Sequence, residues 1–291
     1  FPNFDPLSPQ GVMSDPDKPY INNATQWRSA PGSTFKVITM AAALQHLSGV
    51  SERMFSCTGA YQVGDIQVVD AGHIAHGELT LDKALSVSCN ITFAKLALEL
   101  GDEKLRQTAQ AFGLDDHFLF SDLVVENSAY PANNRVAKEV AWTGPGQSAL
   151  AMTPLHMCLV ASSIANDGVM MEPKILLQAV GKNREGKAQI VPAIYRTPLS
   201  GTDAGIIKQA MRQAVRSGTA TRAAVSGLNV CGKTGSAQID GQELTNAWFI
   251  GFLDEPALPY AVCVVVSDAG EGSRQAAPLA ARIFEYIRNN P

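Results

Sequence analysis

The sequence predicts an α+β fold, in which helices cover an antiparallel β-sheet and the middle of the chain adds a mainly helical lobe. Two patterns support this prediction. Between residues 33 and 168, apolar side chains recur at helical spacing in several segments. Three β-rich runs separated by short turns follow after residue 229. Helices packed on an antiparallel sheet define the α+β class.

The length and composition predict a single large domain. The chain has 291 residues, of which 46% are hydrophobic and 17% charged, and it can bury a substantial core. It shows no internal repeat and no low-complexity linker. We expect one domain over 1–291, with the helical lobe at roughly 37–168 and the sheet with its helices at roughly 170–291.

The charge and hydropathy of the chain indicate neither a nucleic-acid-binding surface nor a membrane-spanning segment. The net charge is -4 and no run of five or more Lys and Arg occurs, so we expect no nucleic-acid partner. No stretch approaches the roughly 20 apolar residues that span a bilayer. The first residues, FPNFDPLSPQ, lack the parts of a signal peptide. Any membrane contact must therefore come from a segment outside this chain.

The helices of the first part are bounded by Pro, Gly and capping signals. Apolar spacing predicts a helix over 33–47, after an entry rich in Pro and Asn. TLDKALSVSCNITFAKLALELG predicts two short helices, the second from about Asn90 to Gly101. TPLHMCLVASSIANDG predicts another, with Pro154 at its start and Gly168 past its end.

The last part combines helices with a β meander. DAGIIKQAMRQAVRSG predicts an amphipathic helix. VCGKTGSAQ, NAWFIGFL and YAVCVVVSD then predict three antiparallel strands. RQAAPLAARIFEYIRNN predicts a final helix with Pro278 in its first turn.

Cysteine and histidine indicate neither a disulfide framework nor a metal site. The cysteines form no CxxC pair and are flanked by small or apolar residues, which is typical of buried free thiols. His73 and His76 stand close in sequence, but no third ligand lies near them in the sequence. We expect a structural role for both histidines and no metal or cofactor. The cysteines are Cys57, Cys89, Cys158, Cys231 and Cys263.

Ser33 and Lys36, at the start of the first helix, are candidates for a nucleophile and its base. A Pro-Gly pair breaks the chain just before them, so Ser33 falls at a helix N-terminus, where the dipole favours developing negative charge. Lys36 shares its face one turn along. Apolar neighbours would lower the lysine pKa by about 2–4 units. A capping serine and a solvated lysine would produce the same spacing.

Two further motifs, together with Ser33 and Lys36, form a pattern that is much more specific than any one motif. SCN covers Ser88 to Asn90 before a helix, and KTGS covers Lys233 to Ser236 in the first strand of the meander. Alone, KTGS is typical of an edge strand with a Gly bulge. On a strand, however, Lys233 and Gly235 share a face, and Gly235 leaves room beside the nucleophile. Ser-x-x-Lys, Ser-x-Asn and Lys-Thr-Gly in this order resemble the signature of serine penicillin-recognising enzymes.

This resemblance extends along nearly the whole chain. PNFDP, PGSTFK, LSVSCNITFAKLALELG, TGPGQSALAMTPLHM, IANDGVMMEPK, GKTGSAQ and NAWFIGF are similar to segments of class B penicillin-binding protein transpeptidase domains. It implies the fold shared with serine β-lactamases. It also implies a portion of a longer protein at the extracytoplasmic face of the bacterial membrane, whose N-terminal anchor and pedestal domain lie outside this chain.

The resemblance implies a role for each motif residue. Ser33 would be the acylated nucleophile, and Lys36 would take its proton. Ser88 would relay that proton to the leaving amine. Asn90 would orient Lys36 and bind the substrate amide. Lys233 would hold Ser88 and stay charged, so that its field keeps Lys36 neutral.

The strand motif would bind the substrate. By resemblance, the backbone N–H groups of Ser33 and Ser236 form the oxyanion hole. The hydroxyls of Thr234 and Ser236 would bind the terminal carboxylate, beside Gly235.

The implied activity is that of a peptidoglycan D,D-transpeptidase. D-Ala-D-Ala stem peptides would acylate the serine, and an amine of a neighbouring stem would resolve the acyl-enzyme into a cross-link. β-Lactams would acylate the same serine and remain bound. The expected partners are peptidoglycan stem peptides, β-lactam antibiotics and other cell-wall synthesis proteins.

Three alternatives share parts of this pattern. A β-lactam sensor domain acylates once without turnover, and the PNFDP entry and long helical middle favour the transpeptidase over it. A D,D-carboxypeptidase uses water as acceptor and shares every motif residue. A β-lactamase would need a residue that activates water, and the sequence has no Glu-x-x-Leu-Asn segment of the kind one class uses.

Overall fold

The computed structural model describes residues 4–5, 7, 9–16, 18–118, 120, 123–132, 135–176, 178–180, 186–189, 191–238 and 245–290. The α-helices are α1 (Lys36–His46), α2 (Leu81–Ser86), α3 (Asn90–Ala111), α4 (Ala137–Thr143), α5 (Pro154–Ala165), α6 (Gly201–Ser217) and α7 (Ala276–Asn289). The strands are β1 (Phe55–Cys57), β2 (Ala60–Val63), β3 (Ile66–Val69), β4 (Gly77–Leu79), β5 (Met170–Met171), β6 (Gln178–Val180), β7 (Gly186–Gln189), β8 (Ile194–Arg196), β9 (Val230–Ala237), β10 (Asn246–Leu253) and β11 (Ala261–Val266).

The predicted β meander is confirmed as a three-stranded antiparallel sheet in the order β11-β10-β9. Every residue of the central strand β10 is buried, since helices cover both faces. Its alternate side chains enter two separate parts of the core. Trp248 and Ile250 pack with residues of α1, α3 and α5. Phe249 and Leu253 pack with α7, around Phe284.

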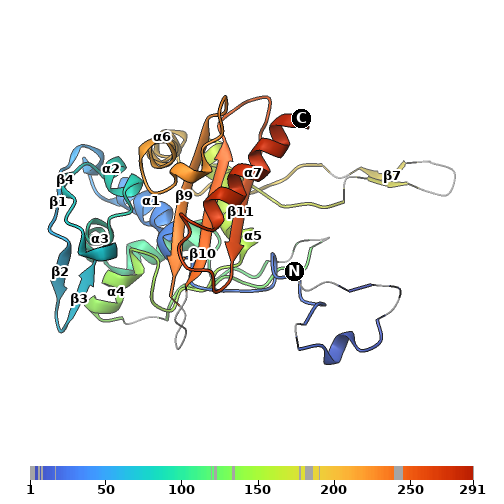
Figure 1. Ribbon diagram of the computed structural model, residues 1–291, viewed down its shortest axis with the longest axis horizontal. Coiled ribbons are helices and arrows are strands. Elements are labelled where there is room, and N and C mark those ends of the chain that lie inside the picture. The colour runs from blue at the N-terminus through green and yellow to red at the C-terminus, as the bar shows by residue number, and fades with distance from the viewer. Residues whose placement is uncertain are drawn as a thin grey trace.

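The helices divide into a sheet-covering group and a lobe (Figure 1). α7 lies over one face of the sheet, α5 packs on β10 and β11, and α6 packs against β9. α1 connects the two groups, since it contacts both α3 and α6. Short strands β1 to β4 lie with α2, α3 and α4 at the far side of α1. This arrangement confirms the predicted α+β architecture.

The predicted helices are confirmed, with two differences in detail. The helix predicted over 33–47 begins as a 3₁₀ turn, Gly32–Phe35, and continues as α1. The helix that starts at Asn90 leaves helical geometry at Gly101, where φ is 75° and ψ is 165°, but it resumes and ends at Ala111. Gly101 is therefore a break within a longer helix, because its left-handed φ interrupts one turn only.

The two-stranded pairs β1-β4 and β2-β3 were not predicted. Each strand has only three or four residues, too few to show an alternating pattern. Within the described part of the chain, no helix combines the length and apolar character needed to cross a bilayer.

Close backbone contacts hold the 3₁₀ turn in place. A Cβ on Gly146, whose φ is +92°, would lie 1.8 Å from the carbonyl oxygen of Gly32 and 2.8 Å from Phe35 Cβ. Only a glycine fits here, both for its backbone conformation and for the space.

Gly146→Ala is therefore expected to destabilise the protein by at least about 2 kcal/mol, since the turn or the loop must move. Gly205→Ala is the matched control, because Gly205 lies inside α6 with open space around it. It should be neutral or stabilising by up to about 1 kcal/mol. Urea unfolding of both variants measures this, and equal stability of Gly146→Ala and the parent chain would contradict the packing described.

Candidate active site

The three sequence motifs converge on one hydrogen-bond network. Lys36 Nζ lies 3.0 Å from Ser33 Oγ and 3.1 Å from Ser88 Oγ. It also donates to Asn90 Oδ1 at 2.7 Å. Lys233 Nζ donates to Ser88 Oγ at 2.9 Å. The Ser88 hydroxyl thus lies between two amines, and all five residues expected to be catalytic are in contact.

The acceptors around Lys36 match a neutral amine. Its two shortest contacts are the carbonyl oxygen of Ser88, at 2.6 Å, and Asn90 Oδ1, and both groups only accept hydrogen bonds. A neutral amine has two N–H donors, which these oxygens use. Its lone pair is then free to face Ser33 Oγ and to accept the hydroxyl proton.

Local structure places each group. Ser33 lies in the 3₁₀ turn and Lys36 is the first residue of α1. Ser88 follows α2 in a left-handed conformation, with φ at 62°, which a non-glycine residue adopts at a cost of about 1–3 kcal/mol. Cys89 caps α3 by accepting a hydrogen bond from the Thr92 amide at 3.3 Å. This left-handed turn lets both Ser88 and Asn90, two residues further on, contact Lys36.

Burial lowers the pKa of Lys36 from 10.5 to about 7, although Cys89 and Asp70 act in the opposite direction. This confirms the direction expected from its apolar neighbours. Lys233, which we expect to stay charged, also has a lowered pKa. Lys233 is fully buried too, and burial together with the charge of Lys36 lowers its pKa well below the usual value. Two ammonium groups on one hydroxyl repel each other, so the structure favours a free amine in this pair.

Strand β9 passes directly against the 3₁₀ turn that carries Ser33. A Cβ on Gly235 would lie 2.8 Å from the carbonyl oxygen of Pro31 and 3.2 Å from the Thr34 amide nitrogen. The expected role of Gly235, to leave room beside Ser33, fits this contact. The carbonyl oxygen of Ser236 is also close to Gly32, within 2.9 Å of the position of a Cβ there.

The two hydroxyls of the strand motif have partners outside it. Thr234 Oγ1 donates to Thr219 Oγ1 at 3.0 Å. Ser236 Oγ accepts a hydrogen bond from the Gly272 amide at 3.1 Å. Sequence reasoning missed Thr219, which lies in the short segment after α6.

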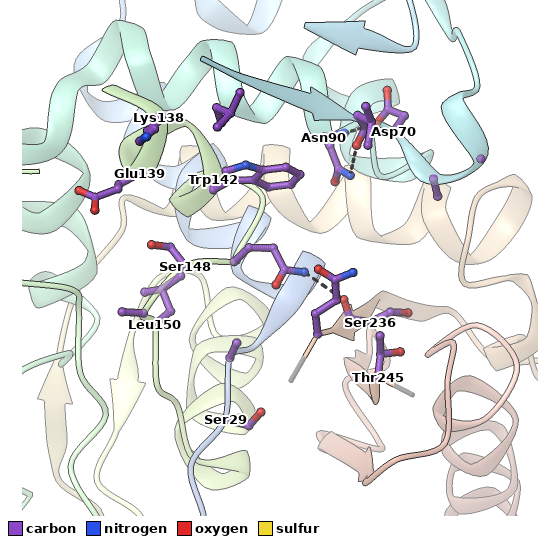
Figure 2. Close-up of a pocket in the computed structure, with 18 of the residues that line it drawn as sticks. Ser29, Asp70, Asn90, Lys138, Glu139, Trp142, Ser148, Leu150, Ser236 and Thr245 are labelled. Carbon is purple, nitrogen blue, oxygen red and sulfur yellow. Dashed lines mark hydrogen bonds between the residues drawn. The ribbon is translucent and has the colours of Figure 1, made fainter. Parts of the chain in front are cut away.

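A cavity of about 1120 Å³ opens beside the network. Figure 2 shows Asn90 and Trp142 on one side of it and Ser236 and Thr245 on the other. Gln147 also lines the cavity, and its side chain donates to the carbonyl oxygen of Ser236 at 3.3 Å. Trp142 was not predicted, since a lone tryptophan carries no local signal of a binding site.

A cluster of possible metal ligands lies next to Asn90. The ligand atoms of Cys57, Asp70, His76 and Cys89 all lie within 4.8 Å of one another. The sequence pairs His76 only with His73, whereas the structure places it beside two cysteines and an aspartate. These residues belong to separate short elements between residues 57 and 89, so spacing along the sequence does not show that they meet.

The comparisons with known proteins identify the family. The model of the penicillin binding protein transpeptidase domain matches residues 1–285. The peptidoglycan D,D-transpeptidase PbpA of Mycolicibacterium smegmatis is 32% identical over 282 residues, which make up 92% of this chain and 57% of the relative. Stage V sporulation protein D of Bacillus subtilis is also 32% identical, over 97% of this chain and 45% of the relative. The chain thus spans about half the length of these relatives.

Solved structures show the same fold. Penicillin-binding protein A from Mycobacterium tuberculosis, as its ceftriaxone acyl-enzyme complex, has a TM-score of 0.89 and 27% identity over 98% of this chain and 69% of that one. The D,D-transpeptidase domain of a peptidoglycan glycosyltransferase from Eggerthella lenta has a TM-score of 0.87 and 28% identity, over 98% of this chain and 71% of that one. With its three motifs assembled at one site, this chain belongs to the family of penicillin-binding protein transpeptidase domains.

Proposed function

We propose that this chain is the catalytic domain of a peptidoglycan D,D-transpeptidase, with Ser33 as its nucleophile. The observation that carries the proposal is the buried amine of Lys36, held 3.0 Å from Ser33 Oγ by Ser88 and Asn90. The name of the Mycolicibacterium relative and the acyl-enzyme complexes of the Mycobacterium tuberculosis protein support the same chemistry.

Acylation follows from this geometry. Ser33 Oγ attacks the carbonyl carbon between the two D-Ala residues, and its proton passes to the free amine of Lys36. The backbone N–H groups of Ser33 and Ser236 stabilise the oxyanion. When the C–N bond breaks, Ser88 gives its proton to the leaving D-Ala amine and regains one from Lys36. The product is an ester between Ser33 and the shortened stem peptide.

The parts of the stem peptide on either side of the reacting carbonyl bind to different residues. The side chain of Asn90 forms a hydrogen bond with the backbone amide of the stem peptide. The hydroxyls of Thr234 and Ser236 bind the terminal carboxylate, next to the amine of Lys233, and the absence of a side chain on Gly235 leaves the approach open. An amine of a second stem peptide then attacks the ester, which restores Ser33 and forms the cross-link. In a β-lactam the leaving group stays tethered, so the ester persists.

The relatives support a proposal for the cellular setting. We place the chain on the extracytoplasmic side of the bacterial cell membrane, anchored by a segment that lies outside residues 1–291, and among other cell-wall synthesis proteins. We also assign 1–291 to a single transpeptidase domain, since the family model matches 1–285.

Benzylpenicillin should form a persistent adduct of one molecule per chain. Ser33→Ala should form none, whereas Ser51→Ala, which removes an exposed serine, should form the same adduct as the parent. Intact mass spectrometry over several hours measures all three. Penicillin consumed without a lasting adduct would indicate a β-lactamase, and an adduct on Ser33→Ala would disprove the assignment of the nucleophile.

The acylation rate should rise with pH and level off above about 7, where Lys36 has lost its proton. Below that pH the amine is protonated and cannot accept the Ser33 proton, so the rate falls by about tenfold per pH unit. Lys36→Arg keeps the positive charge at all pH values and should slow acylation by about 10²- to 10⁴-fold.

Lys104→Arg, on the exposed surface of α3, is the matched control and should keep the parent rate and profile. Stopped-flow acylation by a chromogenic β-lactam gives these rates. A flat profile between pH 5 and 9 in the parent would contradict Lys36 as the base.

A mixed assay with a D-Ala-D-Ala donor and an amine acceptor separates the remaining alternatives. We expect the donor to be transferred to the amine, with the share of transfer rising as the acceptor concentration increases. Hydrolysis at every acceptor concentration would indicate a D,D-carboxypeptidase, and acylation without turnover would indicate a sensor domain.

A further inference from the structure

Thr219 contacts the strand motif but is not one of the motif residues. It lies in the short segment after α6, and its Oγ1 atom is 3.0 Å from Thr234 Oγ1. Thr234 is only 5% exposed, and Thr219 is half-buried. The backbone carbonyl of Thr234 also accepts a hydrogen bond from Lys233 Nζ at 2.9 Å. The two threonine hydroxyls therefore form a pair beside the catalytic network.

The backbone of Thr219 is held between two parts of the site. Its N–H donates to the carbonyl oxygen of Ser86, the last residue of α2, at 3.1 Å. A Cβ on the preceding Gly218 would lie 2.2 Å from the same oxygen, so this segment packs against α2 without room for a side chain. The turn that carries Ser88 follows directly after α2. Thr219 thus connects that turn with β9, and its hydroxyl is held against Thr234.

The hydroxyl of Thr234 has one proton to donate. In the structure it donates this proton to Thr219 Oγ1. A carboxylate only accepts hydrogen bonds, so Thr234 can bind one only when its proton turns towards the carboxylate. Thr219 must then become the donor in the pair. Its hydroxyl can take this role because it also has one proton and two lone pairs.

We propose that Thr219 is a positioning residue that orients the Thr234 hydroxyl towards the terminal carboxylate of the substrate. This inference rests on the proposed D,D-transpeptidase function, in which Thr234 binds that carboxylate. With substrate bound, the hydrogen bonds run from Thr219 to Thr234 and from Thr234 to the carboxylate. Each bond in such a chain polarises the next, and the bond to the charged acceptor is the stronger one. Thr219 acts through Thr234 and takes no part in the proton transfer from Ser33.

The role of Thr219 concerns only the carboxylate end of the substrate. The amine of Lys36 is held by Ser33, Ser88 and Asn90, and these contacts do not involve Thr219. Loss of the Thr219 hydroxyl should therefore weaken the reaction of compounds that carry a free carboxylate and leave the proton transfer unchanged. A purely structural role would slow the reaction of every compound alike.

Acylation by benzylpenicillin and by its methyl ester separates these two roles. The ester has the same ring system and side chain, but its carboxyl group carries no charge. Thr219→Val replaces the hydroxyl with a methyl group and should lower the acylation rate with benzylpenicillin by about tenfold. The rate with the methyl ester should change by less than about threefold, because no charged acceptor is lost. Thr219→Ser keeps the hydroxyl and should stay within about threefold of the parent with both compounds. Intact mass spectrometry at successive times gives the rates.

Thr221→Val, at an exposed position two residues further on, is the matched control and should keep the parent rates with both compounds. Thermal unfolding verifies that each variant is folded, and Thr219→Ala removes the same hydroxyl and serves where Thr219→Val does not fold. An equal loss with the acid and the ester, no loss with either, or a Thr219→Ser variant as slow as Thr219→Val would overturn the proposal. A parent chain that benzylpenicillin does not acylate would instead disprove the proposed function, and the role of Thr219 with it.

Discussion

The site depends on the burial of one amine, that of Lys36, away from solvent. Lys36 is fully buried within the first turn of the central helix, and desolvation brings its pKa to about 7. The carbonyl oxygen of Ser88 and the side chain of Asn90 compensate for part of the lost hydration and fix the direction of the lone pair. A solvated lysine in the same place would be an ammonium ion and could not activate a serine.

The fold holds this amine in place by close backbone packing. β9 and the loop that contains Gly146 both lie against the 3₁₀ turn that carries Ser33, at distances that exclude any side chain on Gly146 and Gly235. On the opposite side, the turn before α3 brings in Ser88 and Asn90. Ser33 is thus enclosed by a strand, a loop and a helix start, and each comes from a different part of the sequence.

Local patterns in the sequence predicted much of this arrangement. Helical spacing and the Pro and Gly boundaries located α1, α5, α6 and α7, and β-rich runs located the sheet. The motif residues were found because their order and internal spacing are specific. The structure shows that Ser33, Lys36 and Lys233 do lie together. The lowered pKa of Lys36 followed from its apolar neighbours.

The remaining features depend on contacts between distant segments. Nothing near Thr219 or Trp142 in the sequence indicates that they lie beside the motifs. The side chains of Cys57, Asp70, His76 and Cys89 lie together although successive members are 6 to 13 residues apart along the chain. The short strands β1 to β4 and the start of α3 bring them together. The lowered pKa of Lys233 arises from full burial and from its shared contact with Lys36 at Ser88, neither of which a sequence displays.

The most direct test of the central claim is the ionisation of Lys36 itself. Lysine labelled with ¹³C at the ε position gives one NMR signal per side chain, and Lys36→Arg identifies the signal that belongs to Lys36. We expect this signal to titrate near pH 7, as the burial of the amine requires. A signal that stays at the position of a charged ammonium up to pH 10 would show that Lys36 cannot serve as the base, and the account of this site would fail.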